Sequence, residues 1–590
     1  MKSFRGFRLP TTQQVQQPTS ASAQLLTRCT QCGAPLAGSP RYVRFRVCDE
    51  CGHTYPIAAR DRIASLVDQN SFHEIESLLM SSDPLEFADE ERYSVRLEEQ
   101  RRQTGEYDAA IVGTATIRGR RVVLGVLDFA FMGGSMGAVV GEKIAIAAEL
   151  ARKDRLPLVT IVASGGARMQ EGLYALLQMA KTTAAVERLR EGNVPYISVI
   201  THPTTGGVFA SFASLGDVII AEPDALVGFA GPRVVEQILG RTLPPGSHTA
   251  EFLFDHGIID AIVDRIRLRG YLADLLGILG SSAQLGEASV TLPQALSALP
   301  EEPLVDAWAA VQIARSGDRP TTSEYIERMF DLFLELHGDR QSGDDPAIVA
   351  GLGVLADHPV AVVGFERGHG EESEARRHGR AVPSGYRKAQ RIMRLAARHG
   401  LPVITLVDTP GAYPGIESEE GGLAGEIAET LALMSALSTR TIAAIIGEGG
   451  SGGALALALA DRVLMQRHAI YSVIAPEGAA AILYRDAERA PELATKLKIT
   501  AQDCLEAGVI DNIVPEPRPS AAADRDEAAK LLRLALLSSL AELEKRPLVA
   551  VTRDRYQRYR SFGRSATVMS GPAHPSKPGV ERSKTTGAAQ

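Results

Sequence analysis

The fold is decided by the stretch Val159-Thr-Ile-Val-Ala-Ser-Gly-Gly-Ala-Arg168, in which a β-branched run ends in two glycines before a helix-prone segment. The second half of the chain has a stretch of the same form, Val403-Ile-Thr-Leu-Val-Asp-Thr-Pro-Gly-Ala412. Short β-branched runs that alternate with longer amphipathic segments are typical of an α/β architecture. The predicted fold class is therefore α/β.

Similar runs extend the pattern on both sides of these stretches. We expect strands at 109–116, 122–127, 159–163, 196–201 and 218–221, and again at 360–365, 403–407, 441–446 and 463–465. Helical patterns lie between them, for example over 141–152 and 172–190. Residues 275–323 hold several prolines and serines, which indicates a linker with connecting helices between two halves.

Two glycine turns in each half keep nearly one spacing. Gly166-Ala167 is offset from Gly411-Ala412 by 245 residues, and Gly206-Gly207 is offset from Gly452-Gly453 by 246. Two landmarks at nearly one offset indicate a duplicated fold. Each turn lies where a strand ends and a helix begins, so unpaired N–H donors and the positive end of a helix dipole meet there.

Two facing turns can hold one oxyanion between their N–H groups. For any single pair of turns, close packing of strand on helix explains the glycines equally well. Four turns in a repeated arrangement favour two oxyanion holes, one in each half.

Three motif matches in the second half are weak. Residues 447–452 fit the dinucleotide fingerprint, but no acidic residue follows ~20 positions later at the end of a second strand. Residues 449–453 fit a serine-hydrolase elbow, but they lie in a glycine run without an obvious histidine partner. Residues 408–411 resemble a nucleotide-switch motif, but the chain has no Gly-Lys-Ser/Thr phosphate loop.

Four of the five cysteines form two Cys-x-x-Cys pairs with fifteen residues between them: Cys29, Cys32, Cys48 and Cys51. This spacing predicts a closed Cys₄ site for structural Zn²⁺, because no coordination position is left for water. Disulfides are the alternative, and the absence of a secretion signal disfavours them. So short a segment cannot hold a core alone, so we expect the metal to supply its folding free energy.

Composition limits the classes of function. Of the 590 residues, 23% are charged and the net charge is -8, which gives no whole-chain case for nucleic-acid binding. No apolar run reaches the ~18 residues of a membrane helix, and we expect a cytoplasmic protein without membrane contact. Residues 1–24 indicate a disordered leader, with an organelle transit peptide as the alternative, and residues 563–590 indicate a disordered tail.

A resemblance to a known family is carried by two sets of motifs. The first set resembles the β subunit of bacterial acetyl-CoA carboxylase carboxyltransferase and comprises 29–51, 131–137, 164–171, 195–198, 206–208 and 228–233. The second set resembles its α subunit and comprises 324–326, 338–340, 383–388, 408–415, 447–453 and 472–478. The chain therefore resembles a fusion of the two subunits over about residues 25–515.

The resemblance implies two crotonase-like domains in tandem, each a spiral of ββα units, after a small Cys₄ zinc ribbon. We expect the ribbon at 25–60, a β-type domain at 61–285, the linker and connecting helices at 286–325, and an α-type domain at 326–562. A homo-oligomer, as a dimer of fused chains, is implied by the same analogy.

The implied reaction moves carboxylate from carboxybiotin, on a biotin carboxyl carrier protein, to acetyl-CoA, giving malonyl-CoA for fatty acid synthesis. A separate biotin carboxylase is implied as well, because the chain has no Met-Lys-Met attachment site and no ATP-binding half. A carboxyltransferase or biotin-dependent decarboxylase for propionyl-CoA or another acyl-CoA is the alternative. A zinc-ribbon nucleic-acid-binding protein, with Arg41, Arg44 and Arg46 as its basic face, is an alternative of a different class.

The resemblance also assigns site residues. The backbone N–H groups of Gly166, Gly206 and Gly207 are implied to stabilise the thioester enolate, and those of Gly411, Ala412, Gly452 and Gly453 to hold the ureido oxygen of biotin. No side-chain base is implied, since the ureido nitrogen takes the proton. Arg387 and Lys388 are candidates for anchoring a phosphate or carboxylate, with a solvated helix face as the alternative. The loops at 366–372 and 416–422 depart from the usual family pattern.

Overall fold

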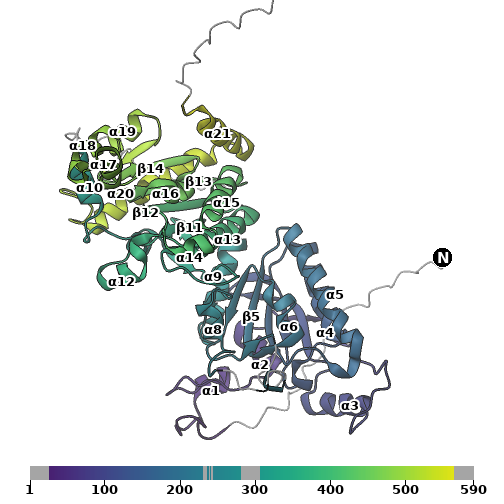
Figure 1. The fold of residues 1–590 in the computed structure, drawn as a ribbon. Helices are drawn as coiled ribbons and strands as arrows, with labels where there is room; N and C mark the ends of the chain where they lie inside the picture. Colours follow the sequence, from purple (N-terminus) through teal and green to yellow (C-terminus); the bar gives the residue numbers. More distant parts are fainter. Residues whose placement is uncertain (1–25, 230–234, 238–239, 241–243, 281–305, 564–590) are drawn as a thin grey trace, which may run out of the picture.

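The two halves of the chain form two lobes (Figure 1). The computed structural model describes residues 26–229, 235–237, 240, 244–280 and 306–563. The predicted leader at 1–24, most of the predicted tail and residues 286–305 of the predicted linker lie outside the described residues. Within the described part, none of the helices combines the length and apolar character that a membrane span requires.

Each lobe is built on one eight-stranded sheet. The first sheet has the order β1-β2-β3-β4-β5-β6-β8, with β7 paired to β5. Its strands are β1 His73–Ile75, β2 Ala110–Ile117, β3 Arg120–Leu127, β4 Leu158–Ser164, β5 Tyr196–Thr205, β6 Val218–Ala221, β7 Val227–Gly228 and β8 Ala261–Ile262.

The second sheet repeats this topology, with the order β9-β10-β11-β12-β13-β14-β16 and β15 paired to β13. Its strands are β9 Leu332–Glu335, β10 Ile348–Leu355, β11 His358–Phe365, β12 Val403–Thr409, β13 Thr441–Gly450, β14 Arg462–Gln466, β15 Ile470–Ser472 and β16 Asn512–Val514. In both sheets the first three strands are antiparallel and the remaining pairs are parallel.

Helices cover the faces of both sheets. In the first lobe they are α1 Pro40–Phe45, α2 Ala59–Leu66, α3 Tyr93–Thr104, α4 Ala138–Asp154, α5 Gly172–Glu191, α6 Gly206–Phe209, α8 Ala250–Asp255 and α9 Leu268–Gly280. In the second they are α10 Ala307–Ala314, α11 Thr322–Met329, α12 Gly370–Ala375, α13 Pro383–His399, α14 Ile416–Glu420, α15 Leu423–Ala436, α16 Ser451–Ala458, α17 Pro476–Tyr484, α18 Ala490–Lys496, α19 Ala501–Glu506, α20 Arg525–Glu544 and α21 Leu548–Ser561.

The predicted strands and the predicted duplication are confirmed. All nine expected strands overlap observed ones. The continuous apolar runs are buried in the parallel part of each sheet, where helices lie on both faces. The register of β4 against β5 shifts between Val162 and Ser164, and that of β12 against β13 shifts between Val407 and Thr409. The offset between these irregularities is 245 residues, as it is between the first pair of glycine turns.

The lobes meet at α9, which packs on β10 and β11, and at α13, which reaches one edge of the first sheet. Both helices lie at the junction of the lobes in Figure 1. Asp217 stands just before β6 and forms an ion pair with Arg398 of α13 at 2.9 Å. Asp260 stands just before β8 and accepts an N–H from Arg391 of α13 at 2.6 Å. The two arginines lie seven residues apart, so they project from one face of the helix.

Helix α21 closes the matching edge of the second sheet. Asp461 just before β14 accepts two N–H groups of Arg555, at 2.8 and 2.7 Å. Asp511 just before β16 accepts an N–H of Arg558 at 2.6 Å. Each lobe therefore has an equivalent pair of aspartates that is neutralised by two arginines of one helix. In the second lobe this helix is its own α21, and in the first lobe it is α13 of the second lobe.

The cysteine segment docks on the first lobe through Arg265. Its guanidinium donates to the carbonyl oxygens of Phe45 at 3.0 Å and Tyr55 at 2.8 Å. Arg46 adds an ion pair of 3.2 Å to Asp61 of α2.

Candidate functional site

The two turns of the first lobe face each other. Gly166 follows β4 with φ +111° and Gly206 begins α6 with φ +63°, conformations that favour glycine. A Cβ on Gly206 would lie 3.1 Å from the Cα of Gly166, so only glycines allow this approach. Gly207 lies in the first turn of α6, where N–H groups lack a partner four residues back.

The N–H of Gly166 already has an acceptor. It donates to the Ser164 hydroxyl at 3.1 Å, and in the second lobe the N–H of Gly411 donates to the Thr409 hydroxyl at the same distance. Both glycines therefore shape their turns, and the donors left for an oxyanion in the first lobe include those at the start of α6.

The turns of the second lobe also meet. A Cβ on Gly453 would lie 2.5 Å from the backbone nitrogen of Ala412, so α16 begins directly against the turn after β12. A Cβ on Gly452 would meet nothing within 4 Å, so Gly452 borders open space. Gly411 has φ +135°.

Sequence reasoning missed Ser451 at this turn. Its φ of +60° matches the +63° of Gly206, from which it is offset by 245 residues. The structural counterparts of Gly206 and Gly207 are therefore Ser451 and Gly452, one residue earlier than the paired glycines suggest. The signal in the sequence was the 245-residue offset between Gly166 and Gly411. The same offset, counted from Gly206, leads to Ser451.

A buried polar network holds the loop after Gly166. Arg168 is fully buried and donates to Asp108 at 2.8 Å. Glu171 accepts the Tyr93 hydroxyl at 2.7 Å and the N–H of Ala138 at 2.6 Å. A carboxylate at the start of α4 also interacts favourably with the helix dipole.

Lys388 and Arg387 do not lie as predicted from the sequence. The ammonium group of Lys388 is buried, donates to the Ile348 carbonyl at 2.8 Å and pairs with Asp344 at 2.7 Å, so it lies on no solvated face. Lys143 donates to the Ala110 carbonyl at 2.9 Å in the first lobe, at an offset of 245 residues. Arg387 pairs with Asp339 at 2.8 Å.

Acidic groups lie beneath the second-lobe turns, in a cluster that the sequence reasoning missed. Glu448, at the end of β13, is buried and accepts N–H groups from Arg315 at 2.7 Å and Arg367 at 3.0 Å. Asp408 accepts the backbone N–H of Glu448 at 2.8 Å. Burial raises the pKa of Asp408, and Arg367 only partly offsets this. Arg367 belongs to the divergent loop at 366–372.

The four predicted zinc ligands are brought together. The sulfur atoms of Cys29, Cys32, Cys48 and Cys51 all lie within 4.8 Å of one another. The closest pairs are Cys29 with Cys51 at 3.6 Å and Cys32 with Cys48 at 3.8 Å. Four converging sulfur donors suit a soft, tetrahedral metal ion, so the set fits the group predicted from its spacing.

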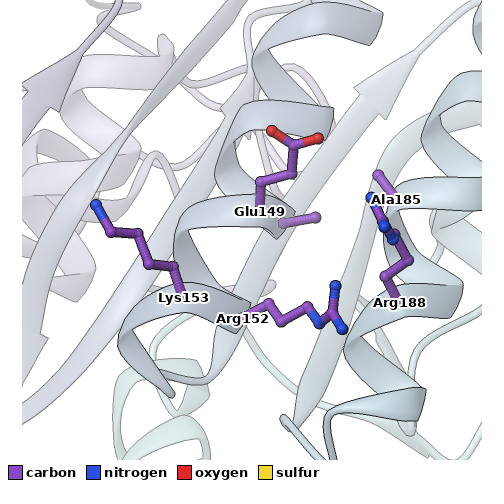
Figure 2. Close-up of a pocket in the computed structure, with 6 residues that line it drawn as sticks. Glu149, Arg152, Lys153, Ala185 and Arg188 are labelled. Carbon is purple, nitrogen blue, oxygen red and sulfur yellow. The ribbon is translucent and has the colours of Figure 1, made fainter.

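Two grooves lie away from the turns. One, of about 750 Å³, lies between the lobes and is lined by six arginines, Arg190, Arg340, Arg387, Arg391, Arg394 and Arg398, among other residues. The other, of about 290 Å³, lies between α4 and α5 beside Glu149, Arg152 and Arg188 (Figure 2). Neither groove is lined by a turn glycine, so neither belongs to the predicted oxyanion sites.

Exposed apolar side chains flank the turns in both lobes. In the first lobe they are Met169, Leu173, Tyr174, Leu176, Leu177 and Phe229. In the second lobe they are Ile416, Leu455, Val473, Ile482 and Leu483. Clusters of this kind mark surfaces that bind a ligand or another protein.

Comparisons with known proteins agree on one family. The sequence model of a family described as acetyl co-enzyme A carboxylase carboxyltransferase-like matches residues 295–563. A protein of Salinispora tropica named acetyl-coenzyme A carboxylase carboxyl transferase subunits beta/alpha is 49% identical over 92% of this chain and 97% of its own length. A protein of the same name from a Parafrankia species is 47% identical, over 91% of each chain. A transcarboxylase 12S crystal structure has a TM-score of 0.64 at 23% identity, over 82% of this chain and 90% of that one, which supports the crotonase-like fold.

Proposed function

The chain belongs to the family of fused beta/alpha carboxyl transferase subunits of acetyl-CoA carboxylase, and we propose that it transfers carboxylate from carboxybiotin to acetyl-CoA, giving malonyl-CoA. The proposal rests on one observation, the pair of facing turns that each lobe repeats at an offset of 245 residues. Each pair of turns offers backbone N–H donors at the start of a helix. One chain carries two such pairs.

The first-lobe turn would hold the acetyl thioester. The N–H groups of Gly206 and Gly207 at the start of α6 would stabilise the oxygen of the developing enolate. Removing one preorganised donor of this kind typically costs about 3–4 kcal/mol of transition-state stabilisation. Gly166 contributes the close approach of the turns, because its own N–H is given to Ser164.

The second-lobe turn would hold the ureido oxygen of biotin. The backbone donors are those of Ala412, Ser451 and Gly452, of which Gly452 borders open space. Carboxybiotin supplies the activated carboxyl group and, once that group has left, a nitrogen that accepts the proton. The chain's own residues orient the two reactants and hold the charge.

Each active site would form between the first lobe of one chain and the second lobe of another. Within one chain, α13 meets the edge of the first sheet and α9 packs on β10 and β11, and neither contact involves the turns. The apolar side chains beside both turns remain exposed in the single chain. A symmetric dimer would bury them against each other and close two equivalent sites.

The metal and the partners complete the proposal. The four cysteines would hold structural Zn²⁺, and the ribbon, the two transferase domains and the linker would have the boundaries expected from the sequence. A biotinylated carrier protein must reach the second-lobe turn, and a biotin carboxylase must recharge it. We place the complex in the cytoplasm.

The test is the reverse reaction with malonyl-CoA and biocytin. Gly207→Val and Gly452→Val are the matched variants, because Gly206 needs its positive φ and a Cβ at Gly207 meets only the flexible Met179 side chain, at 3.0 Å. We expect both variants to fold and to lose about a hundredfold or more in kcat. No wild-type turnover, with the fold intact, would sink the proposal.

Mixing the two dead variants tests where the site forms. In a dimer with sites across chains, about half of all dimers are mixed and each mixed dimer carries one intact site of two, so about one quarter of wild-type activity returns. Sites within one chain would return none. Turnover with methylmalonyl-CoA but not with malonyl-CoA would keep the mechanism and move the substrate to the alternative acyl-CoA.

A further inference from the structure

Two arginines pair with one buried glutamate beside the second-lobe turn, and a third arginine lies in the segment that precedes α13. Glu448 accepts N–H groups from Arg315 at 2.7 and 3.0 Å and from Arg367 at 3.0 Å. Arg315 also pairs with Glu477 at 2.6 Å, and Arg367 lies 3.6 Å from Asp408. Both arginines, and all three carboxylates, are therefore already engaged.

The third arginine is Arg380. Among the residues that the structure describes, its guanidinium forms no hydrogen bond or ion pair, and only its carbonyl accepts an N–H, from Arg377 at 3.2 Å. The side chain is half-buried. Burial lowers its pKa, and although Glu448 opposes this, Arg367 and Arg315 lower it further. A desolvated cation among like charges is costly without a partner.

The backbone places Arg380 along the turn itself. A Cβ on Gly379 would lie 2.7 Å from the Asp408 carbonyl oxygen. The carbonyl of Ala381 accepts the N–H of Tyr413 at 3.0 Å. The segment 379–381 therefore runs beside residues 408–413, which include the proposed donor Ala412.

We propose that Arg380 binds an anionic oxygen group of the substrates at the second-lobe turn, either the carboxylate that is transferred or a phosphate of CoA. This inference rests on the proposed carboxyltransferase function. A guanidinium presents parallel N–H donors that match the oxygens of a carboxylate or a phosphate. The cost of holding the cation without a partner is then recovered when the anion binds, as is common at functional sites.

The experiment compares Arg380→Met and Arg380→Lys with wild type in the reverse reaction. The control is Arg376→Met, since Arg376 lies in the same segment but pairs with Glu372 at 2.6 Å. We expect kcat/KM to fall at least about tenfold in Arg380→Met, with partial rescue in Arg380→Lys, and to change less than about twofold in the control.

Two thioesters separate the sources of the anion. Malonyl-N-acetylcysteamine has the carboxylate but no phosphate. A loss of Arg380→Met activity with both malonyl-CoA and this analogue assigns the carboxylate, and a loss with malonyl-CoA alone assigns a phosphate. Unchanged activity with both overturns the inference.

A second readout separates binding from a structural role. Because Arg380 has no partner to lose, we expect Arg380→Met to unfold in urea at or above the wild-type midpoint, and Arg367→Met to unfold below it. An Arg380→Met variant as unstable as Arg367→Met overturns the inference. Calorimetric titration with malonyl-CoA gives an answer even if wild type shows no turnover: weaker binding by Arg380→Met supports the inference while the proposed function fails, and equal binding overturns it.

Discussion

Arg555 shows how one side chain closes the edge of a sheet. It is buried, pairs twice with Asp461, and donates to the carbonyl oxygens of Met434, Leu437 and Thr439. One guanidinium thus joins Asp461 to the carbonyl oxygens at the end of α15, and Asp461 also accepts the N–H and the hydroxyl of Thr441. Lysine would not replace it, because an ammonium group cannot make this planar set of bonds.

We predict that Arg555→Met lowers the free energy of unfolding by about 3–5 kcal/mol, because Asp461 stays buried without its partner. Urea unfolding measures the change. Arg553→Met is the matched control on the same helix, since Arg553 is exposed and pairs only with Asp554, and it should shift stability by less than about 0.5 kcal/mol. Equal effects of the two substitutions would contradict the prediction.

Glu222 should make stability depend on acid. Burial opposes its charged form, but Arg62 at 2.6 Å and Arg265 at 2.7 Å outweigh burial and lower its pKa from 4.5 to about 2. Since the folded pKa lies below the unfolded one, this stabilisation is present above pH 4.5 and is lost as the pH falls towards 2.

We expect wild type to lose on the order of 2 kcal/mol more than Glu222→Gln when the pH of a urea titration falls from 7 to 3. Glu327→Gln, at a carboxylate with an 82% exposed side chain, should keep the wild-type pH dependence. Parallel curves for wild type and Glu222→Gln would rule out this role for Glu222.

At the scale of elements, we predict that the cysteine segment needs a metal ion to stay folded. Apart from the four sulfur atoms, its docking relies on Arg265 and on the Arg46–Asp61 pair. We predict about one Zn²⁺ per chain in wild type and, after chelation or in Cys32→Ser, none, together with protease cleavage within 26–58. Cys504→Ser, at a buried cysteine outside the cluster, should keep the metal. Zinc bound equally by both variants would contradict the assignment.

How much of these elements can be predicted from sequence depends on where their partners lie. Strands β4 and β12 and their glycine turns are local patterns, so they were predicted with the correct order and spacing. The start of α4 is fixed by Glu171, which lies 33 residues beyond the Ala138 N–H that it accepts. Lys388 of α13 was a candidate anchor for a phosphate or carboxylate because the Ile348 carbonyl that receives it belongs to β10, 40 residues earlier in the chain. Such pairs leave no local pattern.

At the scale of the whole molecule, α13 and α21 perform the same closure in two ways. Arg398 and Arg391 of α13 neutralise Asp217 and Asp260 across the lobes. Arg555 and Arg558 of α21 neutralise Asp461 and Asp511 within the second lobe. The arrangement of the lobes is thereby coupled to the folding of the first sheet's edge. No local sequence pattern indicates this, because the partners are 131 or more residues apart.

We predict that the double variant Arg391→Met and Arg398→Met uncouples the lobes. Calorimetry should resolve two unfolding transitions, the first at a lower temperature, with a loss on the order of 3 kcal/mol from buried carboxylates that each lose an arginine. Arg394→Met is the matched control, because Arg394 pairs with Glu429 inside the second lobe. A single transition at the wild-type temperature would contradict the coupling.

The contact of α13 with the first sheet has a consequence for how such a protein is encoded. The contact includes ion pairs between the side chains at 217 and 398 and at 260 and 391, and none of these residues lies within 281–305. Helix α9 also packs on β10 and β11. Covalent continuity is therefore not the only thing that aligns the lobes. Two genes that divide the message within that interval would yield two polypeptides that recognise each other through the same contacts, and fusion adds proximity rather than a new arrangement.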